Sequence, residues 1–467
     1  MTFSSPIFLF CFFPIVFLGY TIIPNRFLRV RNAFLMLASL LFYGFGEPFA
    51  MLLMLLVVFW SYISAILIAR GGIYRKIAYP LGIIGNLSVL GIYKYTDFIV
   101  ENLNTLLRTQ IPQPTLALPI GISFFIFQAI SYVIDTARKD TSVQRNYFDL
   151  LLYISFFPQL VAGPIVRYQT IADALKKRDY TLSKIADGFQ RMILGLSKKL
   201  LIADTLALVA DTVFYAPDAP SLPTAWLAAI CYTFQIYFDF SGYSDMAIGM
   251  GRIFGFDFPE NFNYPYAAHS ITEFWKRWHI TLTTWFREYL YIPLGGNRNG
   301  KFRTICNKWI VFLCTGIWHG ANWTFILWGA INGLLMTLEQ LLHVPKNPKK
   351  CKPLFHIYTV LAVVLAFVMF RADSAAQAFQ FYAAMFRFSS LTPAAISECT
   401  QLLSPLVCIT LLAACICSVP LLRKFTEKYC TAPRCHAIAR IGTILLLVLC
   451  LLNVAASNYH PFIYFKF

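Results

Sequence analysis

Apolar runs long enough to cross a bilayer recur along almost the whole chain. One crossing takes about 17–25 predominantly apolar residues. On this measure the candidate spans are 5–23, 32–47, 49–69, 77–97, 116–136, 148–166, 189–213, 222–250, 309–342, 355–370, 403–420 and 441–457. Such a series is too long for a membrane anchor. It predicts an all-α polytopic membrane protein, with residues 1–467 forming a single integral membrane domain.

The polar segments between these runs differ in charge. Lys and Arg are concentrated in 24–31, 70–76, 167–199, 343–354 and 423–440, whereas 98–115, 214–221, 372–402 and 458–467 contain few. Cytoplasmic loops carry an excess of Lys and Arg, so the first set is predicted to lie inside and the second outside. Both termini are then expected on the extracytoplasmic face.

Two apolar runs do not fit simple alternation across the membrane. Segment 148–166 has basic flanks at both ends and contains Pro158 and Gly163-Pro164, which break a straight helix. It is predicted to be a re-entrant hairpin. Segment 309–342 also lies between basic flanks, so we expect it to enter and leave on the cytoplasmic side, with its turn in the stretch Trp318–Trp323.

Composition narrows the class of protein further. Hydrophobic residues make up 58% of the 467 residues and charged residues only 13%, which excludes a disordered chain and an ordinary soluble enzyme. The net charge of +17 comes from cations lying between apolar runs, so they are expected to orient the protein in the lipid bilayer, not to bind nucleic acid. Cys430, Cys435 and His436 form the nearest approach to a ligand cluster, and we interpret them as a surface loop; no metal site is expected.

His319 is the leading candidate for chemistry. A histidine deep in an apolar run is costly and usually faces a protein interior or a wet cavity, and a neutral imidazole is the commonest general base near pH 7. Gly316 and Gly320 flank it and would allow a substrate or another backbone to come close. The alternative is a buried histidine that only hydrogen-bonds neighbouring helices.

Residues 270–290 form a second informative block. One stripe at helical spacing is apolar, and it consists of Ile271, Phe274, Trp275, Trp278, Leu282, Trp285 and Tyr289. Ser270 and Glu273 have the spacing of a capping box at the start, and Pro293 with Gly295-Gly296 marks the end. The pattern predicts one amphipathic helix at the cytoplasmic interface, within an interfacial segment spanning 270–298.

The polar residues of this block leave alternatives open. His279 falls at the boundary between the two faces, where it could point into a cavity or cover a helix edge. Lys276, Arg277 and Arg287 could contact the phosphates of an anionic donor, although interfacial cations also contact lipid head groups.

A third block sets carboxyl groups into the apolar run 222–250. Asp239 and Asp245 need partners at membrane depth, and Ser241 and Tyr243 lie between them in the sequence. The carboxyl groups could pair with Arg252 or orient a histidine, so a structural network and a catalytic role both remain open.

These blocks together resemble a known family, the membrane-bound O-acyltransferases. The resemblance lies in the branch that contains alginate O-acetylation proteins and, more distantly, D-alanyl transfer proteins. The matching motifs cover about residues 115–335, and they are Pro119–Gln128, Tyr237–Gly249, Asn261–Tyr266, Glu273–His279 with Tyr291–Arg298, and Trp318–Gly320. The closing Pro461–Phe467 and the full length look more like the alginate-type proteins.

The resemblance implies a family fold, with re-entrant segments around a central tunnel. It implies that His319 is the catalytic histidine and His279 the second functional polar position. The other candidates for binding the donor or lining the tunnel are Asp239, Ser241, Tyr243, Asp245, Lys276, Arg277, Arg287 and Asn322.

The resemblance also implies an activity. The chain would pass an acetyl group from a cytoplasmic thioester, with acetyl-CoA as donor substrate and no bound cofactor, across the bacterial inner membrane for O-acetylation of an extracytoplasmic polysaccharide such as alginate. An SGNH-hydrolase-like partner of the AlgJ or AlgX type would complete the transfer. D-alanyl transfer to teichoic acid, with a small acidic acyl-carrier protein on the basic loops, is the first alternative. A secondary transporter, which also has broken helices and intramembrane carboxyl groups, is the second.

Overall fold

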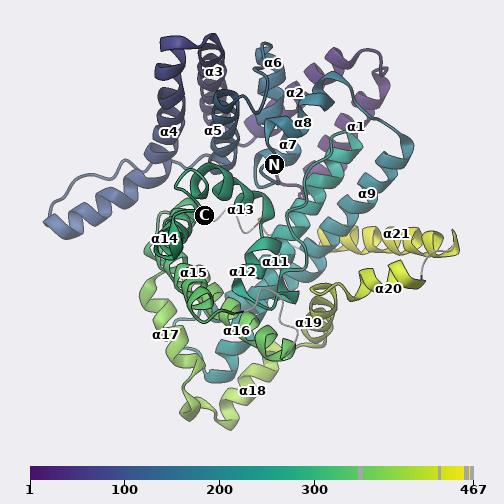
Figure 1. The fold of residues 1–467 in the computed structure, drawn as a ribbon. Coiled ribbons are helices and arrows are strands. Elements are labelled where there is room, and N and C mark those ends of the chain that lie inside the picture. Colours follow the sequence, from purple (N-terminus) through teal and green to yellow (C-terminus); the bar gives the residue numbers. More distant parts are fainter. Residues whose placement is uncertain (345–350, 430–432, 457–461, 463–467) are drawn as a thin grey trace. The chain divides into compact units, whose positions relative to one another are not determined.

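The computed structural model describes residues 1–344, 351–429, 433–456 and 462, and the regular elements within these ranges are all helical (Figure 1). The first half contains η1 Phe8–Phe12, α1 Phe13–Ile22, α2 Leu28–Gly44, α3 Pro48–Arg70, α4 Gly72–Leu107, α5 Ile122–Arg138, α6 Tyr147–Ser155, α7 Phe157–Leu160, α8 Tyr168–Lys176, α9 Leu182–Ser197, η2 Lys198–Ala203, α10 Asp204–Phe214 and α11 Leu222–Ile253. The second half contains η3 Pro265–Ala267, α12 Ile271–Arg277, α13 Ile280–Phe286, η4 Arg287–Tyr291, α14 Gly300–His319, α15 Trp323–Leu341, α16 Lys352–Arg371, α17 Ala375–Met385, η5 Phe388–Ser390, α18 Pro393–Leu402, α19 Pro405–Cys417, α20 Leu421–Tyr429 and α21 Pro433–Ala456. The Pro461–Phe467 motif lies outside the described residues apart from Phe462, as do Cys430 and the side chains of Cys435 and His436.

Contacts within the chain divide it into two compact units. The first contains Met1–Met192 and Tyr243–Glu260, and the second contains Ile193–Gly242 and Asn261–Phe467. Helices α9 and α11 contribute residues to both. In the first unit α3, α4 and α5 lie side by side (Figure 1), and Ile68, Ala78, Val133 and Ala137 pack together there.

Helices with the length and composition of membrane spans are fewer than the apolar runs of the sequence. Four helices in the described ranges qualify, Pro48–Arg70, Gly72–Leu107, Lys352–Arg371 and Ala437–Ala456. A fifth span would be the pair Pro393–Leu402 and Pro405–Cys417, bent by 76°. Other runs are too short, such as α2 and α5 with 17 residues each. Run 148–166 is interrupted at Phe156 between α6 and α7, so the predicted helix break there is confirmed.

The predicted hairpin around His319 is present in the second unit. Helices α14 and α15 pack along each other, and His319 is the last residue of α14. Two glycines allow this close approach. A Cβ added at Gly316 would lie 2.3 Å from the Phe325 carbonyl oxygen, and one at Gly329 would lie 2.5 Å from that of Phe312. Backbone therefore packs against backbone beside the histidine.

We expect Gly316→Ala to lower stability, because its methyl group must push the α15 backbone away. Overpacking of this kind costs about 1–3 kcal/mol, and the expected readout is a lower apparent Tm of the detergent-solubilised protein. Gly442→Ala is the matched control. A Cβ there meets no atom of the described chain within 4 Å, so its Tm should be unchanged or higher. Equal Tm values for the two variants would contradict the close packing at Gly316.

Candidate active site

The block 270–290 is two short helices separated at His279. Helix α12 ends at Arg277 and α13 begins at Ile280, while His279 itself has φ +42° and ψ +55°. The prediction of one continuous amphipathic helix is therefore wrong. The predicted apolar stripe is confirmed, since all seven of its residues are buried. A left-handed conformation is unusual for a residue with a side chain and is found preferentially at functional sites.

Asn261 explains why the helix breaks at this point. Its backbone oxygen accepts a hydrogen bond from the Ile280 amide at 2.9 Å. Its side-chain Oδ1 accepts from the Thr281 amide at 3.2 Å and from the Thr281 hydroxyl at 2.9 Å. Asn261 is fully buried, so these bonds hold the first turn of α13 away from the axis of α12. The hydrophobic periodicity of the sequence does not indicate this role for Asn261, although Asn261 is the first residue of the Asn261–Tyr266 motif.

The same Asn261 oxygen fixes the tautomer of His279. Nδ1 of His279 lies 3.1 Å from Asn261 Oδ1. The Thr281 amide can only donate, so the atom facing it is the oxygen, and His279 Nδ1 must carry the hydrogen. The lone pair of the ring is then on Nε2, which is buried and has no hydrogen-bond partner in the described part of the chain.

His279 is fully enclosed, so of the two arrangements left open its ring does not cover an exposed helix edge. Its side chain is 1% exposed and its ring meets Phe240 edge-on at 4.7 Å between centroids. Burial lowers the pKa of His279 to about 3. The imidazole is therefore neutral over the physiological range, because its charged form would lose its hydration.

His319 occupies an aromatic enclosure at the α14–α15 turn. The centroid of its ring lies 5.0 Å from Trp318, 5.1 Å from Trp328 and 5.0 Å from Phe370. The Trp318 ring also lies 6.1 Å from the ring of His279. The structure therefore brings the two predicted histidines to one tryptophan in the second unit.

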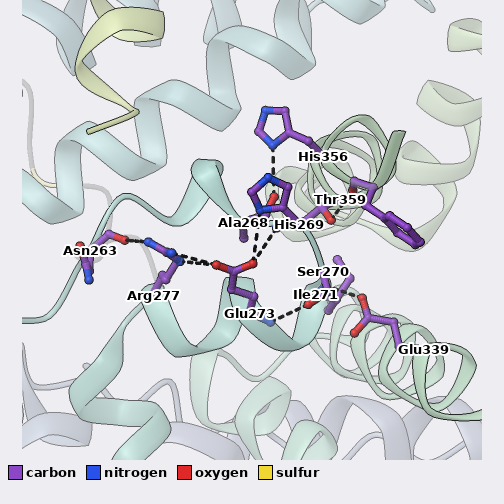
Figure 2. A network of polar contacts seen from close by, with 11 residues as sticks. Asn263, Ala268, His269, Ser270, Ile271, Glu273, Arg277, Glu339, His356 and Thr359 are labelled. Atoms are coloured by element: carbon purple, nitrogen blue, oxygen red, sulfur yellow. Dashed lines mark hydrogen bonds and ion pairs between the residues drawn. The ribbon is translucent and has the colours of Figure 1, made fainter. Parts of the chain in front are cut away.

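A polar network fixes the start of α12 (Figure 2). Ser270 Oγ accepts from the Glu273 amide at 3.0 Å, so the predicted cap is confirmed, but the Glu273 carboxylate reaches the amide of His269, at 2.9 Å, and not that of Ser270. Buried Glu339 from α15 accepts from the Ile271 amide at 2.5 Å and the Thr272 amide at 3.0 Å. A carboxylate at a helix N-terminus is stabilised by the helix dipole. Glu339 lies more than sixty residues after α12 in the sequence, so no local motif predicts this contact.

The predicted donor-binding cations have different surroundings. Arg277 bonds Glu273 at 2.8 Å and the Asn263 carbonyl at 3.1 Å (Figure 2), so it is held within the network. Lys276 is exposed, and Arg287 is exposed beside Glu288 at 3.0 Å. Asn322 caps α15.

The Glu273–Arg277 pair predicts a pH effect on stability. Burial alone would raise the pKa of Glu273, but the His269 amide and Arg277 lower it below its ordinary 4.5. The stabilisation is therefore present above about pH 4.5 and lost as pH falls through the lower folded-state pKa. We expect the Tm difference between wild type and Glu273→Gln to shrink from pH 7 to pH 3; a constant difference would contradict the charge effect.

The two carboxyl groups of α11 have cationic partners that differ from the predicted ones. Asp239 pairs with Lys199 at 2.7 Å in the second unit, and Lys199 also pairs with Asp204 at 2.7 Å. Asp245 pairs with Arg191 at 2.6 Å in the first unit. Lys199 and Arg191 therefore balance the charge of these two carboxylates. Lys199 is buried in the π-helical turn η2, whereas its sequence position suggested a loop cation.

The remaining predicted residues on α11 are both buried. Ser241 Oγ has no hydrogen-bond partner among the described residues. Tyr243 stacks on Phe3 in the first unit, with 4.5 Å between ring centroids. The structure therefore gives Tyr243 a packing role within that unit.

The fold and the site define a class of protein: a multi-pass helical membrane protein with two buried histidines beside one tryptophan. The sequence pattern of the membrane-bound O-acyltransferase family, MBOAT, matches residues 93–381. The chain belongs to this family, and it is an O-acyltransferase.

Three relatives show where in the family the chain falls. It is 40% identical to a probable alginate O-acetylase AlgI of Azotobacter vinelandii over the full length of both proteins. It is 37% identical to a peptidoglycan O-acetyltransferase of Helicobacter pylori, over 80% of this chain and 77% of the relative. It is 28% identical to a teichoic acid D-alanyltransferase of Bacillus subtilis, over 53% and 65%. The resemblance found in the motifs, including its more distant D-alanyl branch, is confirmed.

Proposed function

We propose that the chain transfers an acetyl group from acetyl-CoA, bound on the cytoplasmic side, to an acceptor hydroxyl on the other side of the inner membrane. The end use is O-acetylation of an extracytoplasmic polysaccharide of the alginate type. The observation that carries this proposal is the enclosed pair His279 and His319, whose ring centroids lie 6.1 Å and 5.0 Å from that of Trp318. Full-length similarity to an alginate O-acetylase supports the acyl group and the polymer.

The surroundings of the two histidines favour different roles. His279 is a poor proton acceptor, since burial lowers its pKa to about 3, but its Nε2 can accept a hydrogen bond from a neutral donor group. We assign it the positioning of the donor, because Nε2 can accept a hydrogen bond from an amide N–H of the pantetheine arm of CoA. His319, at a helix turn beside two glycines, is then the general base for the acceptor hydroxyl.

The proposed step balances without a cofactor. The acceptor oxygen attacks the thioester carbonyl carbon, a C–O bond forms and the C–S bond breaks. His319 takes the hydroxyl proton and returns it to the leaving thiolate. Products are the acetyl ester and CoA, and His319 is regenerated neutral.

The orientation follows from the loop charges. Cation-rich segments such as 70–76 would face the cytoplasm and the anionic donor. Both termini would then be extracytoplasmic, on the side where an SGNH-hydrolase-like partner would take the acetyl group to the polymer.

The two alternative functions, D-alanyl transfer and secondary transport, are supported unequally by the comparisons with known proteins. D-alanyl transfer from a carrier-protein thioester remains the second candidate, but the D-alanyltransferase relative matches only 53% of the chain. A secondary transporter does not agree with membership of an acyltransferase family.

The donor distinguishes the two transferase candidates. Purified protein in detergent should release CoA from acetyl-CoA and leave D-alanyl carrier protein unchanged. Release from the carrier protein alone would favour the D-alanyl reaction. Inactivity on both, in the presence of membrane extract supplying partner and acceptor, would overturn the proposed donor.

A further inference from the structure

A small cavity lies in the second unit, beside the aromatic enclosure of His319. Its volume is about 170 Å³, and it is formed by residues of α10, α11 and α16 and by the start of α15. Phe325 and Phe370 form part of its wall, and their ring centroids lie 6.5 Å and 5.0 Å from that of His319. A group in this cavity is therefore separated from His319 by one layer of aromatic rings.

Two buried polar atoms of the cavity wall have no hydrogen-bond partner among the described residues. Gln235 is 8% exposed and Thr324 is 1% exposed. Neither Gln235 Oε1 nor Thr324 Oγ1 has a hydrogen-bond partner within the described ranges. Buried polar atoms are nearly always paired, so the cavity offers an acceptor and a hydroxyl to a guest that can bond both.

The charges of the cavity favour a neutral guest. The guanidinium of Arg371 bonds Asp211 at 2.6 Å and lies 3.9 Å from Asp373. It also lies 4.6 Å from the centroid of the Tyr215 ring. Two carboxylates thus surround one guanidinium, and the partial positive charge of the α15 N-terminus offsets the excess only in part. A carboxylate guest would be repelled.

The volume limits the size of the guest. A protein cavity of about 150 Å³ holds a benzene molecule, so about 170 Å³ suits a group of roughly six to eight non-hydrogen atoms. A neutral alcohol of this size fits, whereas a uronate unit within a polymer is too large and carries the wrong charge.

We propose that this cavity binds the hydroxyl-bearing end of the acyl acceptor and selects a neutral alcohol over a uronate. This inference rests on the proposed function, because it names the acceptor for His319. Gln235 would accept the hydrogen bond of one guest hydroxyl, Thr324 would bond a second polar atom, and the ring wall would open toward His319. The group acetylated first is then not the uronate polymer itself.

The test uses glycerol, glycerate and N-acetylserinamide as probes with the purified full-length protein. Glycerate matches glycerol in size and differs in its carboxylate, and N-acetylserinamide would enter with its hydroxymethyl end. Neutral probes should raise the Tm and act as acetyl acceptors, and glycerate should do neither. Gln235→Leu and Thr324→Val preserve shape, and each should raise the KM for glycerol at least tenfold and abolish the Tm rise. Thr212→Val, at an exposed position of α10, should behave as wild type.

The outcomes separate this inference from the proposed function. Wild-type response in both cavity variants, or equal effects of glycerate and glycerol, would overturn the acceptor site. A Tm rise that depends on Gln235 and Thr324 without acetyl-CoA turnover would support the site and contradict the proposed donor. Preferential use of N-acetylserinamide over glycerol would identify a polypeptide as the source of the hydroxyl, and the reverse preference would identify a polyol or sugar.

Discussion

His319→Ala is expected to lower acetyl transfer by about 10²–10⁴-fold, the usual contribution of a positioned general base. The reason is local: the ring lies at the α14–α15 turn, enclosed by Trp318, Trp328 and Phe370, where bulk water cannot replace it as the base. The fold should survive, since one imidazole contributes little to so large an apolar interior.

The measurement is CoA release from acetyl-CoA with glycerol as acceptor, together with size exclusion in detergent. His343→Ala is the matched control, because His343 is an exposed histidine just beyond α15. Control and wild type should agree. Loss of the folded protein in His319→Ala would favour a structural histidine, and full transfer would remove His319 from the mechanism.

The sequence was sufficient for the hairpin that carries His319. Basic flanks on both sides of an apolar run longer than one crossing leave few arrangements besides a helical hairpin, and Gly316 and Gly320 mark the point of close approach. The apolar stripe of 270–290 was predictable for a similar reason, since burial enforces helical spacing on both sides of the break.

The break itself was not predictable from periodicity. It depends on Asn261, ten residues before the start of α12, and hydrogen bonds between such positions leave no repeat in the sequence. Lys199 illustrates the converse limit. Beside Lys198 and near other cations it looks like loop charge, yet the fold buries it between Asp204 and Asp239.

Both wrong expectations, for Asn261 and for Lys199, concern the bonding partners of buried polar side chains. A hydrophobic pattern indicates which positions are buried. The orientation of a buried polar side chain depends instead on the single partner atom that lies within bonding distance of it. The candidate site is built from such partners: Asn261 for His279, Glu339 for the start of α12 and Arg277 for Glu273. Its apolar walls and the Ser270 cap were therefore foreseeable, and these three contacts were not.

Asn261→Ala is expected to have the second largest effect, on both stability and transfer. It leaves His279 Nδ1 and both donors of Thr281 without their acceptor in a fully buried site. An unsatisfied buried donor costs about 1–3 kcal/mol. Without that acceptor the hydrogen of His279 is free to move to Nε2, so transfer should fall at least about tenfold even in the folded fraction. Asn263→Ala is the control, because this exposed residue hydrogen-bonds Arg277 through its backbone atoms.

Asn261→Asp tests whether the lost activity comes from the tautomer or from instability. A carboxylate keeps the acceptor for Nδ1–H and Thr281, but it also favours the imidazolium form and so raises the pKa of His279 from about 3. The transfer rate of Asn261→Asp should then be recovered at high pH and decline as pH falls through the raised pKa of His279. In wild type, His279 should cause no change in the transfer rate over that pH range. A pH profile identical to wild type would show that His279 does not need to be neutral, and would remove the positioning role assigned to its Nε2.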